Sequence, residues 1–153
     1  MERRELIRWL VATAGLPSLA FGRRLYDHVE RTLAVATERI LPGAAGAHVG
    51  AFIEKMLADW HTPVERERLL AGLADLDMRC RARASRDFAD CAVTDQVAVL
   101  TALDDEAFAP ETNEHWFARL KYLTVYGYCT SEVGMRALRL YPQPWRYDGC
   151  APV

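Results

Sequence analysis

One stretch, Leu120–Cys150, constrains most strongly what this chain can fold into. It starts with the spacing of an amphipathic helix, carried by three apolar residues: Trp116, Leu120 and Leu123. Small hydroxyl and acidic residues at 130–132 suit the start of a second helix, Val133–Leu140. Two prolines then end the helical pattern, because proline lacks the amide hydrogen and fixes the backbone. The residues Tyr141–Cys150 are therefore predicted to form an extended tail that carries several aromatic side chains.

The rest of the chain shows the same helical periodicity. Apolar residues at helical spacing predict four earlier helices, at about 29–40, 44–60, 63–83 and 94–105. The sequence Thr62-Pro63-Val64-Glu65 has the pattern of a capping box at the start of the third of these helices. No stretch alternates for long enough to predict a strand. The fold class is therefore all-α, a single compact domain of five or six helices with an extended proline- and aromatic-containing C-terminal tail.

Composition excludes several function classes. The chain has 153 residues, 51% of them hydrophobic, which fits one globular domain with a real core. The formal net charge of −2 does not favour a nucleic-acid partner. The histidines are scattered, with no second ligand one helical turn away: His28, His48, His61 and His115. There is no Cys-x-x-Cys-His motif and no glycine-rich nucleotide loop. We therefore expect no catalytic, cofactor-binding or metal-binding residues in this chain.

The N-terminus has the pattern of a twin-arginine export signal. Arg3 and Arg4 precede a 13-residue apolar stretch, Trp9–Phe21, and the segment Ser18–Ala20 near its end has small residues where a signal peptidase would cut. The apolar stretch is shorter than the roughly 20 residues that span a bilayer, so no transmembrane span is expected. Residues 1–22 are assigned to this signal and residues 23–153 to the helical domain. The alternative is that residues 1–22 form the first amphipathic helix of the domain.

Three segments resemble the gluconate 2-dehydrogenase subunit 3 family. They are the block Thr124–Gly134 (TVYGYCTSEVG), the ending Pro144–Cys150 (PWRYDGC) and, more weakly, Ala34–Ala51. The resemblance implies a small helical subunit of a bacterial sugar, polyol or glycoside dehydrogenase. It implies a large FAD-dependent catalytic subunit of the GMC type as the partner, in some complexes joined by a c-type cytochrome subunit. FAD is expected in that partner and not in this chain.

The resemblance also implies a role and a location. The small subunit would support the folding, stability and twin-arginine export of the flavoprotein, and the complex would lie in the periplasm or on the periplasmic face of the inner membrane. If residues 1–22 are not a signal, the protein would be cytoplasmic. The alternative function is a self-contained cytosolic helical regulator or ligand-binding bundle.

The C-terminal stretch supplies the predicted partner interface. Broad amphipathic rings are typical anchors of protein interfaces, and a glycine between two of them permits close approach of a neighbouring helix or of the partner's backbone. The predicted interface residues are Tyr126, Gly127, Tyr128, Thr130, Ser131, Glu132, Tyr141, Trp145 and Tyr147. The alternative for each aromatic residue is a place in the core of this chain.

Four cysteines, an even number, permit disulfides if the protein is exported. A bond between Cys129 and Cys150 would hold the tail against the end of the helix before it, and Cys80 with Cys91 would form the second pair. The alternative is that the protein folds in a reducing cytoplasm before export and that its thiols stay buried and free.

Overall fold

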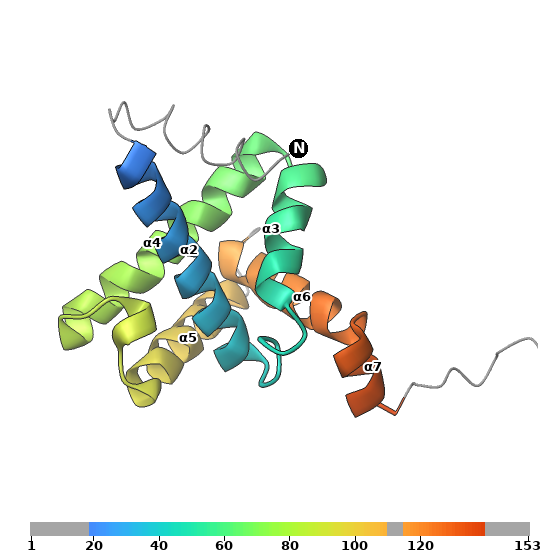
Figure 1. The fold of residues 1–153 in the computed structure, drawn as a ribbon. Helices are drawn as coiled ribbons and strands as arrows, with labels where there is room; N and C mark the ends of the chain where they lie inside the picture. The colour runs from blue at the N-terminus through green and yellow to red at the C-terminus, as the bar shows by residue number, and fades with distance from the viewer. Residues whose placement is uncertain (1–18, 110–114, 140–153) are drawn as a thin grey trace, which may run out of the picture.

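A computed structural model of the chain describes residues 19–109 and 115–139, with side chains from residue 26 onward. Figure 1 shows that these residues form a bundle of crossing helices. The described part contains six α-helices, one short 3-10 turn and no strand, which confirms the all-α prediction. The elements are α2 (Leu19–Ile40), α3 (Val49–Asp59), α4 (Pro63–Ala84), η1 (Phe88–Asp90), α5 (Val93–Ala107), α6 (Trp116–Cys129) and α7 (Glu132–Ala137).

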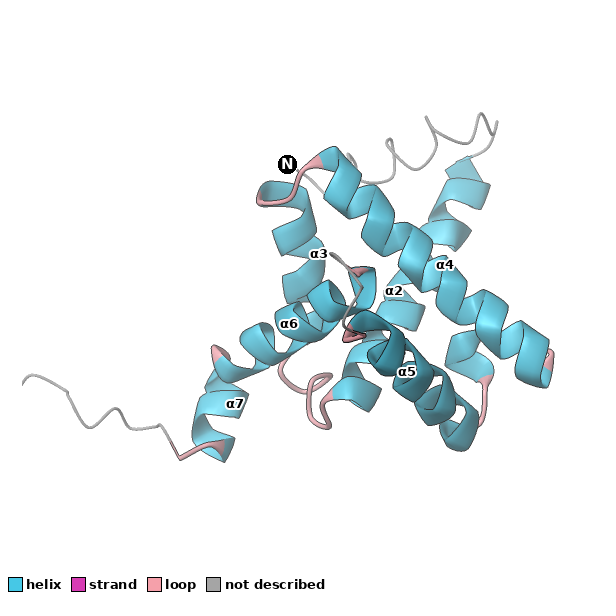
Figure 2. Cartoon of the chain, turned by 180° about the vertical axis from the view of Figure 1, so that it is seen from behind, coloured by secondary structure: helices cyan, strands magenta, loops and turns pink. Residues whose placement is uncertain are grey.

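Helix α6 is the centre of the bundle. It packs against every other α-helix of the described part, and Figure 2 shows it between α3 and α5. Its inner face follows the 3.6-residue helical repeat, with Phe117, Leu120, Leu123, Thr124 and Gly127 all buried. These side chains meet apolar residues of the surrounding helices, among them Leu33, Ile53, Leu73, Leu76 and Leu103. The apolar spacing in the sequence thus identifies the helix on which the core is built.

The predicted capping box at the start of α4 is present. The Thr62 hydroxyl accepts a hydrogen bond from the backbone N–H of Glu65, and the Glu65 carboxylate accepts one from the backbone N–H of Thr62 at 2.8 Å. Two of the backbone donors that a helix start leaves unpaired are thereby satisfied. The cap predicted within residues 130–132 is also present, because the Ser131 hydroxyl accepts from the N–H of Gly134 at 3.0 Å. Helix α7 is shorter than predicted and ends at Ala137.

The start of α3 lies later than the predicted residue 44. Residues 41–48 form turns, and His48, which precedes the helix, has left-handed backbone angles. The cause is a side chain of the preceding helix, since the Glu38 carboxylate accepts hydrogen bonds from the backbone N–H groups of Gly43 (3.0 Å) and Ala45 (2.8 Å). Gly43 has a φ of 97°, a conformation that glycine adopts without strain. These hydrogen bonds, made five and seven residues along the chain from Glu38, hold the turn against the helical spacing of the alanine-rich sequence.

Two buried polar side chains hold the segment between α4 and α5. Asp77 accepts a hydrogen bond from the backbone N–H of Phe88 at 2.9 Å and contacts the His28 ring at 2.7 Å. The Gln96 amide donates to the carbonyls of Phe88 (2.9 Å) and Cys91 (3.2 Å). The η1 turn is therefore held by side chains from both flanking helices.

None of the described helices combines the length and the apolar character that crossing a membrane requires.

Candidate functional site

The glycine of the Thr124–Gly134 block faces the interior of this chain. Gly127 is buried in α6, and a Cβ built on it would lie 2.6 Å from Cδ1 of Phe52 in α3. Real Cβ atoms essentially never come that close to another atom, so a side chain at this position would force the Phe52 ring to shift. The close approach predicted for Gly127 is made by a neighbouring helix of the same chain.

The second glycine of the block forms the corner between α6 and α7. Gly134 is buried, and a Cβ built on it would lie 2.7 Å from the carbonyl carbon of Tyr128 and closer still to the oxygen. Tyr128 itself is half-buried, and its ring lies over the turn at Gly43. This part of the family block therefore shapes the fold.

The polar residues of the predicted interface cap the helices at this corner. The Thr130 hydroxyl donates to the carbonyl of Tyr126 at 2.8 Å, and Ser131 caps α7 as described above. Glu132 is exposed and forms an ion pair with Arg136 at 2.6 Å. The remaining predicted residues lie outside the described residues: Tyr141, Trp145, Tyr147, Cys150, Arg3 and Arg4. The interface and export assignments made for them stay predictions.

An aromatic row lies on the outer face of α6. Tyr122 and Tyr126 stack with ring centroids 6.0 Å apart, and the Phe52 ring follows at 5.9 Å from Tyr126. The Arg119 guanidinium lies over the Tyr122 ring, 5.5 Å from its centroid. We call these four residues the aromatic row. Tyr122 is 57% exposed and Tyr126 is 46% exposed, so two large rings face outward next to each other. Tyrosine and arginine are enriched among the residues that dominate binding at interfaces.

The sequence prediction included Tyr126 but missed Arg119, Tyr122 and Phe52. Arg119, Tyr122 and Tyr126 follow one another at i, i+3 and i+7, which places them on one side of a helix. That spacing could have identified these three residues in the sequence as one face of a helix. Phe52 comes from another helix, and its place in the row depends on the packing at Gly127.

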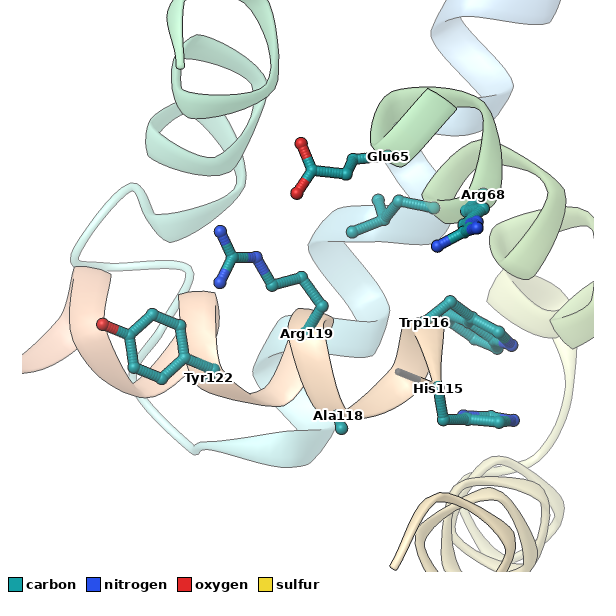
Figure 3. Close-up of a pocket in the computed structure, with 8 residues that line it drawn as sticks. Glu65, Arg68, His115, Trp116, Ala118, Arg119 and Tyr122 are labelled. Carbon is teal, nitrogen blue, oxygen red and sulfur yellow. The ribbon is translucent and has the colours of Figure 1, made fainter. Parts of the chain in front are cut away.

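A pocket of about 330 Å³ adjoins the arginine end of the aromatic row. It lies between the start of α4 and the start of α6, and Figure 3 shows Arg119 extending between Glu65 and the Tyr122 ring. Its lining mixes charged and aromatic side chains, from Glu65, Arg68, Leu69, His115, Trp116, Ala118, Arg119 and Tyr122. A concave site with a few charged groups and flat apolar walls suits a polar side chain or small ligand.

A buried histidine fixes the arginine of this pocket. His61 is 8% exposed, and its Nδ1 lies 2.9 Å from the carbonyl oxygen of Met56, which can only accept a hydrogen bond. The proton is therefore on Nδ1, and Nε2 is free to accept. Arg119 donates to that Nε2 from Nε at 3.1 Å and from Nη2 at 2.9 Å. Both ring nitrogens of His61 are thus used in positioning Arg119.

The acid at the rim of the pocket is held by the cap of α4. The Thr62 backbone N–H and hydroxyl both donate to Glu65, and these hydrogen bonds keep the pKa of the Glu65 carboxyl below its ordinary value. The positive charge of Arg119 acts in the same direction, but less strongly. Glu65 therefore stays ionised to a lower pH than an ordinary glutamate, and it already has hydrogen-bond partners in Thr62.

Cys80 and Cys91 are free thiols, so the second predicted pair is not formed. Cys80 and Cys91 are buried next to each other, and burial together with a hydrogen bond to Cys91 raises the pKa of Cys80 to about 12. A thiol with so high a pKa is a poor nucleophile at neutral pH. Cys129 is half-buried, and its predicted partner Cys150 lies outside the described residues, so that pairing stays a prediction.

Across residues 19–109 and 115–139, no group of three or more His, Cys, Asp or Glu side chains is arranged to hold a metal ion. The fold defines a class, a small all-α domain with an aromatic row on the outer face of α6. Over residues 27–148 the sequence matches the family described as gluconate 2-dehydrogenase subunit 3. The chain belongs to that family. Comparisons with curated proteins and with solved structures each gave no match.

Proposed function

We propose that the chain is the non-catalytic small subunit of a bacterial FAD-dependent dehydrogenase complex of the GMC type. The observation that carries the proposal is the family match over residues 27–148. The aromatic row on α6 supports it, because tyrosine and arginine are enriched among the residues that dominate binding at protein interfaces. Oxidation of the sugar, polyol or glycoside would take place on the partner, with the FAD bound there.

The same proposal assigns the chain a role in assembly and export. A folded flavoprotein that crosses the membrane together with this subunit needs a stable interface before export, which favours large aromatic anchors. Arg3 and Arg4 would supply the twin-arginine signal, and the complex would then work in the periplasm. A c-type cytochrome subunit would be a third component where the complex contains one.

The test is co-expression of the tagged chain with a GMC-type flavoprotein from the same genome. We expect a stable pair in which the larger chain shows the visible absorption bands of flavin. Replacing Arg3 and Arg4 by lysine should keep both chains in the cytoplasm. A chain that is soluble and monomeric alone, and that binds no flavoprotein, would favour the self-contained helical regulator instead. Dehydrogenase activity reaching the periplasm at the wild-type level in the double-lysine variant would contradict the export role.

A further inference from the structure

Arg119 is held differently from the described arginines that form ion pairs. Five described arginines form ion pairs with carboxylates: Arg31 with Asp90, Arg79 with Asp75 and Glu106, Arg81 with Asp87, Arg83 with Asp95 and Arg136 with Glu132. No carboxylate of the described residues accepts a hydrogen bond from Arg119. Its hydrogen-bond acceptor is the imidazole of His61, which has no negative charge.

The geometry holds this guanidinium ready for an anion. His61 engages Nε and Nη2, and Met56 fixes the His61 ring, so the arginine has little freedom to turn away. Nη1 makes none of these hydrogen bonds and is available as a donor. The side chain is exposed, and it lies against the Tyr122 ring at the edge of the pocket. An arginine placed in advance loses less conformational entropy when it forms a salt bridge.

The charge around Arg119 is only partly balanced. Glu65 is the nearest acid of the pocket, but its Oε2 is occupied by the Thr62 backbone N–H and hydroxyl, both at 2.8 Å. The Arg119 guanidinium lies beside the flat walls of Trp116 and Tyr122 in the described part of the lining. This combination complements an acidic side chain that is flanked by apolar residues.

We propose that the pocket between α4 and α6 receives an Asp or Glu side chain of the flavoprotein subunit, which pairs with Arg119. The outward-facing rings of the aromatic row, Tyr122 and Tyr126, would contact the apolar residues on one side of that acid. This inference rests on the proposed function and goes beyond it, because it names the site on this chain and the chemistry of the partner's segment. His61 acts on binding only through Arg119, as a positioning residue.

The variant Arg119→Gln tests the charge while keeping a neutral N–H donor that can still bond to His61. With the co-expressed flavoprotein as the probe, we expect binding at physiological salt to weaken by about tenfold to a hundredfold, the range of a central charged anchor. The affinity of the wild-type chain should fall with rising salt, and that of the variant should fall less steeply. Tyr122→Ala should weaken binding in the same direction without removing the charge.

The matched control is Arg31→Ala, which removes an exposed arginine from α2 whose carboxylate partner is also exposed. It should bind like the wild-type chain. Helix content and unfolding midpoints of all variants confirm that they are folded. If the wild-type chain binds the flavoprotein and Arg119→Gln binds equally well with the same salt dependence, the pocket proposal is wrong while the proposed function stands. If the wild-type chain does not bind, the proposed function fails first. If the wild-type chain forms a dimer and Arg119→Gln is a monomer, this face is a contact between two copies of the chain. That result would overturn the pocket proposal.

Discussion

The corner between α6 and α7 gives the sharpest test of the structure. Replacing Gly134 by alanine adds a Cβ that would lie 2.7 Å from the carbonyl carbon of Tyr128, where ordinary contacts begin at 3.4 Å. The obstacle is backbone, so no side-chain rotation relieves the clash. Helix α7 must instead move away from the end of α6 by more than half an ångström, and the Ser131 cap and the contact with the Tyr128 ring move with it.

The change in folding free energy caused by Gly134→Ala follows from two opposing effects. Overpacking a tight contact costs about 1–3 kcal/mol. Alanine in place of glycine within a helix returns about 0.5–1 kcal/mol, because the unfolded backbone loses freedom. The net cost for Gly134→Ala is therefore about 1–2 kcal/mol. Since α7 has six residues and contacts mainly α6, much of that cost should appear as local opening of α7.

Amide hydrogen exchange measures this opening directly. The amides of Met135 and Leu138, which bond within α7, should exchange about tenfold faster in Gly134→Ala, as each 1.4 kcal/mol is a factor of ten. The matched control is Gly50→Ala in α3, where the nearest atom to the added Cβ is 3.9 Å away. That variant should be as stable as the wild type or slightly more so. Unchanged exchange in α7 together with an unchanged unfolding midpoint for Gly134→Ala would refute the steric argument.

Three further predictions concern the polar anchors of the fold. Thr62→Ala removes the capping box of α4 and should cost about 1 kcal/mol in chemical unfolding, whereas an unchanged midpoint would contradict it. Gln96→Ala leaves the carbonyls of Phe88 and Cys91 without their buried donor and should cost about 1–3 kcal/mol, with an effect under 0.5 kcal/mol counting against the network. Two backbone N–H donors lower the pKa of Glu38 below its ordinary 4.5, so its stabilisation is present above that pH and is lost as pH falls through the lowered folded value. Glu38→Gln should therefore lose stability at neutral pH and show a flatter decline in acid, and parallel pH profiles of the two proteins would refute this.

The sequence was sufficient where structure is determined locally. The capping box at Thr62 and the cap at Ser131 need only side chains within three residues of the helix start, so both could be read from the residue types. The late start of α3 could not, because the turn over residues 41–48 depends on Glu38 reaching forward from α2. Helical periodicity alone carries no information about such an anchor.

In the candidate site, too, some features could be predicted from the sequence and others required the fold. Tyr126 was predicted from residue type, but the role of Gly127 in fitting α6 against Phe52 required the fold. The pocket joins α4 to α6 through residues about fifty apart in the sequence, and His61 holds Arg119 across that distance. The spacing of Arg119, Tyr122 and Tyr126 was visible in the sequence, and it marks one helix face rather than a site.

The central position of α6 has a consequence for how the protein is made. Ribosomes deliver the chain from its N-terminus, so α2 to α5 emerge before the helix that covers their apolar faces. Until Trp116–Cys129 has left the ribosome, the nascent chain presents Leu33, Ile53 and Leu76 to solvent or to chaperones. Cooperative folding of this domain therefore begins only after α6 has emerged, and stalled fragments that lack α6 should bind chaperones or aggregate. Residues 1–22 leave the ribosome long before the helical domain that follows them has folded.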